Sequence, residues 1–224
     1  MGEVAGLLGV QVAAPSFPVR PPGRSLPGLR IGLLSTYPPK VCELGAFAAA
    51  LESALTELDS RVSVVRVESS IDPVTVAPAG VMTLTNGQPR SLQNAAIWLS
   101  RNDVAVIQHD FGVYGGSDGD EVLHVLEQIT VPSMVVLHSV PNSPNASQRF
   151  IVCAITDRVD LVVVLTETAS ALLVNDYGVP ARRVTVIPQG ALGPTEDGML
   201  WSSVAAQYLD AARSLLRAPQ TLAI

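Results

Sequence analysis

Two kinds of hydrophobic pattern alternate along the chain. Short, nearly continuous apolar segments are separated by longer segments in which apolar residues recur every three or four positions. Short apolar segments are typical of buried strands, and the wider spacing is typical of amphipathic helices. We therefore expect strands at 29–35, 61–67, 103–109, 133–138, 161–165 and 184–187, and helices at 46–58, 91–100, 120–129, 145–158 and 166–176.

The regular alternation of strands and helices predicts an α/β fold, a single Rossmann-like domain whose mostly parallel sheet is flanked by helices. We expect this domain to extend over 29–217. The preceding residues, 1–28, contain five closely spaced prolines and are expected to form a flexible arm, and 218–224 are expected to form a tail. The Pro- and Gly-punctuated segment 69–90 is expected to be a connection with at most a small hairpin that turns at Asn86-Gly87.

The last helix is expected at 199–217. Its apolar stripe is wide enough to pack against the core of the domain, and it consists of Trp201, Val204, Ala205, Tyr208, Leu209, Ala212, Leu215 and Leu216. Nearer the middle of the chain, Thr166 is expected to cap the start of a helix, and Gly178 lies where that helix should have ended.

Composition and net charge argue against several classes of protein. Hydrophobic residues make up 48% of the 224 residues and charged residues only 15%, which suits one buried parallel sheet. The formal net charge of −6 argues against a nucleic-acid groove and a polybasic membrane surface. No apolar stretch reaches the roughly 18 residues that a membrane span needs. The isolated Cys42 and Cys153 lack metal-ligand spacing, so we expect reduced thiols in a cytoplasmic protein without a metal or cofactor site.

Candidate chemistry lies in the loops that follow the strands, because the carboxyl ends of parallel strands form the ligand-binding edge of such a sheet. His138 ends one buried strand there, and the pair His109-Asp110 ends another. An imidazole at this edge can hydrogen-bond a ligand hydroxyl or stabilise developing charge. The alternative for His138 is a structural histidine that caps its strand. His124 lies within a predicted helix and is expected to face solvent.

A glycine-rich loop follows the His109 strand, over 111–119. It has neither the Gly-x-x-x-x-Gly-Lys-Ser/Thr pattern of a phosphate-binding loop nor the Gly-x-Gly-x-x-Gly pattern of a dinucleotide-binding loop. An ordinary dinucleotide binder is therefore disfavoured. We expect a tight turn that lets a ligand approach the backbone.

Four segments resemble the N-terminal, acceptor-side domain of family-4 retaining glycosyltransferases. They are Ile31–Lys40, Val106–Gly116, Val136–Ser139 and Arg182–Gly190, and residues 200–217 resemble the last helix of the same enzymes. These enzymes have the GT-B architecture, in which two Rossmann-like domains face each other across a cleft. The resemblance implies that this chain has the fold of one half of a GT-B enzyme together with its final crossover helix.

The resemblance also implies residue roles. It places His138 beside the reacting sugar as a catalytic candidate. It assigns acceptor binding to His109, Asp110, Phe111, Gly112, Tyr114, Gly115 and Gly116, and a donor-phosphate loop to Lys40, Glu43 and Gly45. The family usually has glycine where this chain has Glu43. A carboxylate at that position repels a diphosphate, so we expect the loop to be degenerate.

The donor-side domain of these enzymes has no counterpart in the sequence. Only about ten residues separate the last resembling loop, which ends at Gly190, from the run that begins at Trp201. We therefore expect a glycosyltransferase-like protein that binds a nucleotide sugar weakly and does not catalyse transfer alone. The alternative is a non-catalytic module that binds a sugar or lipid acceptor or docks on a partner transferase chain. We expect the chain to form a homodimer or bind such a partner through an exposed apolar patch of Tyr37, Pro38, Pro39, Phe111, Val113 and Tyr114.

Overall fold

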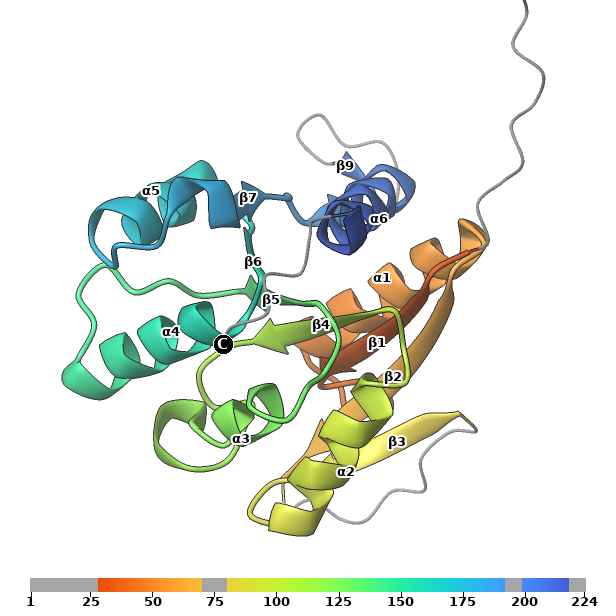
Figure 1. Ribbon diagram of the computed structural model, residues 1–224, viewed down its shortest axis with the longest axis horizontal. Coiled ribbons are helices and arrows are strands. Elements are labelled where there is room, and N and C mark those ends of the chain that lie inside the picture. The colour runs from red at the N-terminus through yellow and green to blue at the C-terminus, as the bar shows by residue number, and fades with distance from the viewer. Residues whose placement is uncertain (1–27, 70–79, 192–198, 218–224) are drawn as a thin grey trace, which may run out of the picture.

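A seven-stranded parallel sheet forms the middle layer of the computed structural model, which describes residues 28–69, 80–191 and 199–217 (Figure 1). The strand order is β3-β2-β1-β4-β5-β6-β7, and every neighbouring pair is parallel. The strands are β1 (Arg30–Ser35), β2 (Arg61–Glu68), β3 (Val81–Thr85), β4 (Val104–His109), β5 (Ser133–Leu137), β6 (Leu161–Val164) and β7 (Val184–Val186).

Helices cover both faces of this sheet. One face packs against α1 (Glu43–Glu57) and α6 (Trp201–Arg217). The other packs against α2 (Pro89–Leu99), α3 (Val122–Leu126), α4 (Ala146–Arg158) and α5 (Glu167–Asn175). The expected fold class, an α/β domain with a parallel sheet flanked by helices, is therefore confirmed.

The double covering explains why the strand sequences are almost continuously apolar. In β4, Ala105 and Ile107 point into one core while Val104 and Val106 point into the other. Successive side chains of a strand point to opposite faces, so a strand buried on both faces needs an apolar residue at every position.

The expected helix signals near the middle of the chain are confirmed. The Thr166 side chain accepts a hydrogen bond from the backbone N–H of Ala169 at 3.1 Å and caps α5. Gly178 lies just beyond that helix with a φ of 74°, a backbone conformation that favours glycine. At the start of α4, Asn145 and Gln148 cap each other's backbone N–H groups.

The structure corrects two expectations about the middle of the chain. The expected hairpin at Asn86-Gly87 is wrong, because residues 81–85 form the parallel edge strand β3 beside β2, and the turn leads into α2. An Asn-Gly pair signals a turn but not the direction of the chain after it. The helix expected over 120–129 is shorter, because a 3₁₀ turn (Ser117–Gly119) precedes α3, and Asp118 and Gly119 have positive φ values of 52° and 86°.

The final helix α6 lies along α1 and belongs to the core. Its Tyr208, Leu209 and Val204 are buried, and Trp201 packs edge-to-face on Phe47 with 5.0 Å between ring centroids. Two short strands precede it, β8 (Gly190–Ala191) and β9 (Met199–Leu200), and they pair in parallel. The arm and tail expected at the two ends concern residues that, apart from Gly28, lie outside the described ranges.

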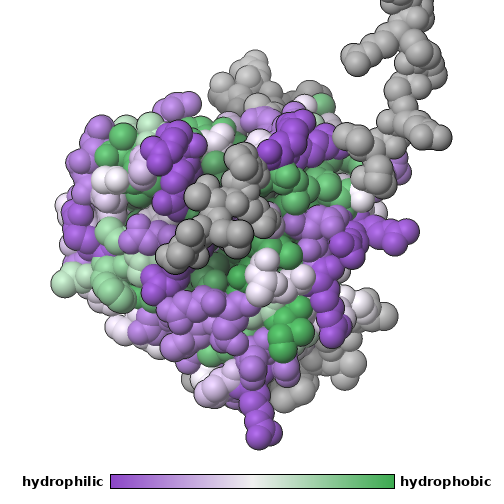
Figure 2. Space-filling view, in the orientation of Figure 1, coloured by the Kyte–Doolittle hydropathy of each residue, from purple (hydrophilic) through white to green (hydrophobic). Residues whose placement is uncertain are grey.

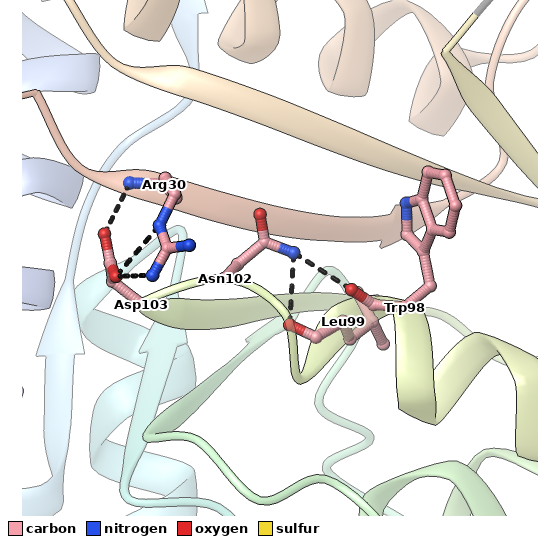
Figure 3. Close-up of polar contacts among 5 residues, drawn as sticks. All are labelled: Arg30, Trp98, Leu99, Asn102 and Asp103. Carbon is pink, nitrogen blue, oxygen red and sulfur yellow. Dashed lines mark hydrogen bonds and ion pairs between the residues drawn. The ribbon is translucent and has the colours of Figure 1, made fainter.

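Polar contacts fix the amino edge of the sheet, opposite the candidate site (Figure 3). The Arg30 side chain pairs with Asp103 at 2.6 Å and joins the start of β1 to that of β4. The Asn102 side-chain amide donates to the backbone oxygens of Trp98 and Leu99, both at 3.1 Å, and so satisfies carbonyls at the end of α2. Within the described residues, no helix has the length and apolar character needed to cross a membrane.

Candidate functional site

The carboxyl edge of the sheet brings the candidate loops together. The central strands β4 and β5 are neighbours, and the backbone N–H of His138 donates to the backbone oxygen of His109 at 3.0 Å. Two hollows lie at this edge. We call them the histidine cavity and the inner hollow.

The histidine cavity has a volume of about 250 Å³. It is lined by Glu43, Leu44, Phe47, Asp110, His138, Ser139, Leu165 and Gln189, which come from the first turns of α1 and from the segments that follow β4, β5, β6 and β7. Two of these residues are acidic, and none of the described lining residues is a lysine or an arginine. The cavity is therefore suited to a ligand that donates hydrogen bonds, such as a hydroxyl-rich one, and unsuited to a phosphate.

His138 lies in this cavity as a neutral imidazole. Its ring packs edge-to-face on Phe47, with 4.8 Å between centroids. Burial lowers the pKa of His138 to about 4, although the nearby Asp110 carboxylate acts in the opposite direction. Its Nε2 is buried and has no hydrogen-bond partner among the described residues. A buried polar atom left without a partner is costly, and a ligand hydroxyl bonded to Nε2 removes that cost.

His109 lies deeper than an acceptor-contacting residue would. The side chain is fully buried, between Phe111 and Tyr114, with ring centroids 5.4 Å and 6.1 Å away. Burial lowers its pKa to about 4, Asp110 acts against that shift, and His138 adds to it. Neither ring nitrogen has a hydrogen-bond partner among the described residues. The structure thus places His109 beneath the glycine-rich loop and not on its surface.

The inner hollow, of about 320 Å³, lies at the glycine-rich loop that follows Asp110. It is lined by Lys40, Ser69, Asn86, Gly87, Gly112, Val113, Tyr114, Gly115, Gly116 and Glu121. It thus contains four of the seven residues expected to bind an acceptor. Gly112 and Gly116 have φ values of 87° and 83°, which explains why this loop needs glycine at those positions.

Three polar residues of the inner hollow were not predicted from the sequence: Ser69, Asn86 and Glu121. The Asn86 side-chain amide donates to the backbone oxygen of Val113 at 3.0 Å, while its Oδ1 is buried without a partner among the described residues. Asn86 was noticed only as part of a turn signal. Its position at the end of an unpredicted strand was the missing information.

The expected donor-phosphate loop is split by the structure. Lys40 lines the inner hollow, whereas Glu43 lines the histidine cavity at the first position of α1. Gly45 is buried in the helix, and a Cβ there would approach the Cys42 Sγ to 3.2 Å and the Lys40 backbone oxygen to 3.3 Å. Glycine at position 45 therefore allows close packing of the start of α1 against Cys42 and the Lys40 backbone. The Glu43 carboxylate occupies the positive end of the helix dipole, where a bound anion would lie.

The expected apolar patch is smaller than predicted. Tyr114 is buried, with its hydroxyl donating to the Gln108 backbone oxygen at 2.7 Å, so its expected exposure is wrong. Tyr37, Phe111 and Val113 are half-buried and pack against the two cores. Only Pro38 and Pro39 of the expected set are exposed, and Val41 beside them is fully exposed. Polar and apolar residues also intermingle over the face drawn in Figure 2.

Comparisons with known proteins identify the fold. No protein-family model matches the sequence, and no curated protein matches it. A structure of sucrose-phosphate synthase from Thermosynechococcus elongatus is 16% identical, with a TM-score of 0.52, over 83% of this chain and 98% of that chain. An α-glucosyltransferase in complex with UDP and a 13-mer DNA is 12% identical, with a TM-score of 0.55, over 74% of this chain and 43% of that chain. The fold is that of one half of a GT-B glycosyltransferase.

Proposed function

We propose that this chain is the acceptor-binding half of a GT-B glycosyltransferase related to family 4, and that it does not transfer sugar alone. It binds a hydroxyl-rich acceptor in the inner hollow, with His138 at the adjoining histidine cavity where the transferred sugar would meet that acceptor. The observation that carries this proposal is that each hollow holds a buried polar atom without a partner among the described residues, Asn86 Oδ1 in the inner hollow and His138 Nε2 in the histidine cavity.

The groups in these hollows suit hydroxyls. The Asn86 Oδ1 and the His138 Nε2 are both buried without partners among the described residues. Each is a polar atom that a ligand hydroxyl can satisfy, since a hydroxyl both donates and accepts. One fold neighbour is in complex with DNA. We do not propose DNA as a ligand of this chain, because the formal net charge of this chain, −6, disfavours binding of a polyanion.

The pairing of β8 with β9 supports a donor half that is missing from this position in the chain. Parallel strands normally need a connection of roughly a dozen residues or more, whereas only seven, 192–198, join these two. A parallel pair with a short connection is expected where a longer inserted segment once joined the two strands.

Titration calorimetry with two ligand classes tests this proposal. We expect neutral saccharides to bind saturably, and uridine or guanosine diphosphate sugars to show no saturable binding below about millimolar. Replacement of Asn86 by alanine should weaken saccharide binding, and Asn94→Ala on the exposed side of α2 is the matched control. Saccharide binding that neither variant changes, or a micromolar dissociation constant for a nucleotide sugar, would contradict the proposal.

Glu43 provides a second test of the donor side. Its carboxylate lies at the start of α1, so Glu43→Gly should strengthen any weak nucleotide-sugar binding. Glu57→Gly at the other end of α1 is the control for the cost of a helical glycine. Weaker binding by Glu43→Gly would show that the diphosphate does not lie there.

A partner chain that supplies the donor half is the second candidate role. It is favoured by the exposed apolar tip formed by Pro38, Pro39 and Val41 beside the site. A second copy of this chain would not bring a donor half, but it is the simplest chain that could cover the same tip. Light scattering at micromolar concentration should report a dimer that Val41→Arg dissociates and Ile97→Arg, on the half-exposed face of α2, does not. A monomer for the unmodified chain and for both variants would contradict the homodimer.

A further inference from the structure

A third hollow, which we call the outer hollow, continues from the acceptor site. Its volume is about 320 Å³, and it lies between the start of α2 and α3, lined by Gly87, Pro89, Leu92, Glu121, His124 and Gln128. It shares Gly87 and Glu121 with the inner hollow. The two hollows are therefore neighbours on one surface, separated by a waist that these two residues form.

Within the described part of the chain, one hydrogen bond joins the two sides of the waist, and the carboxylate in that bond can still bind a ligand. The backbone N–H of Gly87 donates to Glu121 Oε2 at 2.8 Å. The same carboxylate lies against Gly115, where a Cβ would collide with it. An ionised carboxylate offers about four acceptor positions, so one bond leaves capacity toward both hollows. Gly115 is thus needed to keep Glu121 at the waist.

The outer hollow has the chemistry of a neutral, amphipathic ligand. Glu121, His124 and Gln128 offer hydrogen-bonding groups, and Pro89 and Leu92 offer apolar surface. None of the lining residues that the structure describes is a lysine or an arginine, so an anionic group has no partner there. A sugar ring presents hydroxyl edges and a C–H face, and so matches both kinds of surface. A lipid chain offers no hydrogen-bonding group to Glu121, His124 or Gln128, although Glu121 and Gln128 each already make one hydrogen bond within the protein.

From this geometry we propose that the acceptor is a neutral oligosaccharide that extends from the inner hollow past Glu121 into the outer hollow. The proposal rests on the proposed function and specifies the length and charge of its acceptor. Each hollow alone is at the lower limit, roughly 300 Å³, of ordinary ligand sites, so neither holds a long ligand by itself. His124 is exposed, as the sequence predicts, and its side chain lines this hollow.

The test is a chain-length series. Neutral glucans, mannans and galactans of one to four units are titrated against the full chain, with isotope-labelled amide signals followed by nuclear magnetic resonance. We expect affinity to rise about tenfold from mono- to trisaccharide for the preferred sugar, the gain from one or two further hydrogen bonds. The amide signals of His124 and Gln128 should shift with the trisaccharide only.

A matched pair of variants tests whether the outer hollow supplies the gain in affinity for the trisaccharide. Gln128→Leu keeps a similar side-chain size but removes the polar group from the outer hollow, so it should lower trisaccharide affinity to the monosaccharide level. Gln93→Leu, an exposed glutamine on α2 outside the hollow, should leave the gain intact. Equal affinity for all lengths, or a gain that survives Gln128→Leu, overturns the oligosaccharide proposal alone. The absence of binding by every saccharide overturns this proposal and the proposed function together.

Discussion

The contribution of α6 can be measured with two leucines of that helix. Leu209 is 3% exposed and packs in the core shared with α1, whereas Leu216 is 42% exposed. Leu209→Ala removes three buried carbons and leaves a cavity, which costs roughly 2–5 kcal/mol. Leu216→Ala removes the same atoms from a partly hydrated position, and its cost should stay within about 0.5 kcal/mol.

Differential scanning calorimetry gives the readout. For a domain of this size, each kcal/mol lowers the melting temperature by roughly 2–4 °C, so Leu209→Ala should lower it by roughly 4–20 °C. Leu216→Ala should leave it nearly unchanged. Truncation before Met199 removes the buried Val204, Tyr208 and Leu209, each worth roughly 1.5–3 kcal/mol, and that total is comparable with the whole stability of a domain.

Two results would refute this reasoning. Equal melting shifts for Leu209→Ala and Leu216→Ala would show that α6 does not dock as the structure places it. A truncated chain that melts cooperatively at the parent temperature would show that the helix is dispensable. Loss of cooperative melting after truncation, with the ordered shifts of the two alanine variants, supports an integral helix.

Two further predictions concern stability. Asn102→Ala removes two side-chain hydrogen bonds to the Trp98 and Leu99 backbone oxygens, which keep their backbone donors, and should cost roughly 0.5–1.5 kcal/mol in urea unfolding, whereas Asn94→Ala on the exposed face of α2 should cost far less. Burial lowers the pKa of His109 and His138 to about 4, whereas a histidine in the unfolded chain has a pKa of about 6.5. Below about pH 6.5 the unfolded chain therefore binds more protons than the folded chain does. The stabilisation is therefore complete above about pH 6.5 and should be lost as the pH falls toward 4. His138→Gln should flatten that melting-temperature profile and the exposed His124→Gln should not; parallel profiles for all three proteins would contradict the assignment.

The order of elements could be predicted from the sequence because burial on both faces leaves a local signature. The apolar runs of β1, β4, β5 and β6 were evident, and so were the Thr166 cap and the stripe of α6. The edge strand β3 was missed since an edge strand is only partly buried, and its sequence alternates weakly between apolar and polar residues. Local pattern also correctly indicated which loops reach the carboxyl edge of the sheet.

The site itself depended on how those loops pack. Sequence order placed Lys40 and Glu43 in one loop, yet they line different hollows, and Glu43 lies in the first turn of α1 whereas Lys40 precedes that helix. Tyr114 lies in a glycine-rich loop that suggests exposure, but its ring fills space beside His109 and its hydroxyl satisfies a strand carbonyl. Asn86 and Glu121 are 35 positions apart and share the inner hollow. Hydrophobic periodicity determines which residues enter the core, whereas long-range packing decides which polar side chains face the same hollow, and only the tertiary structure contains that information.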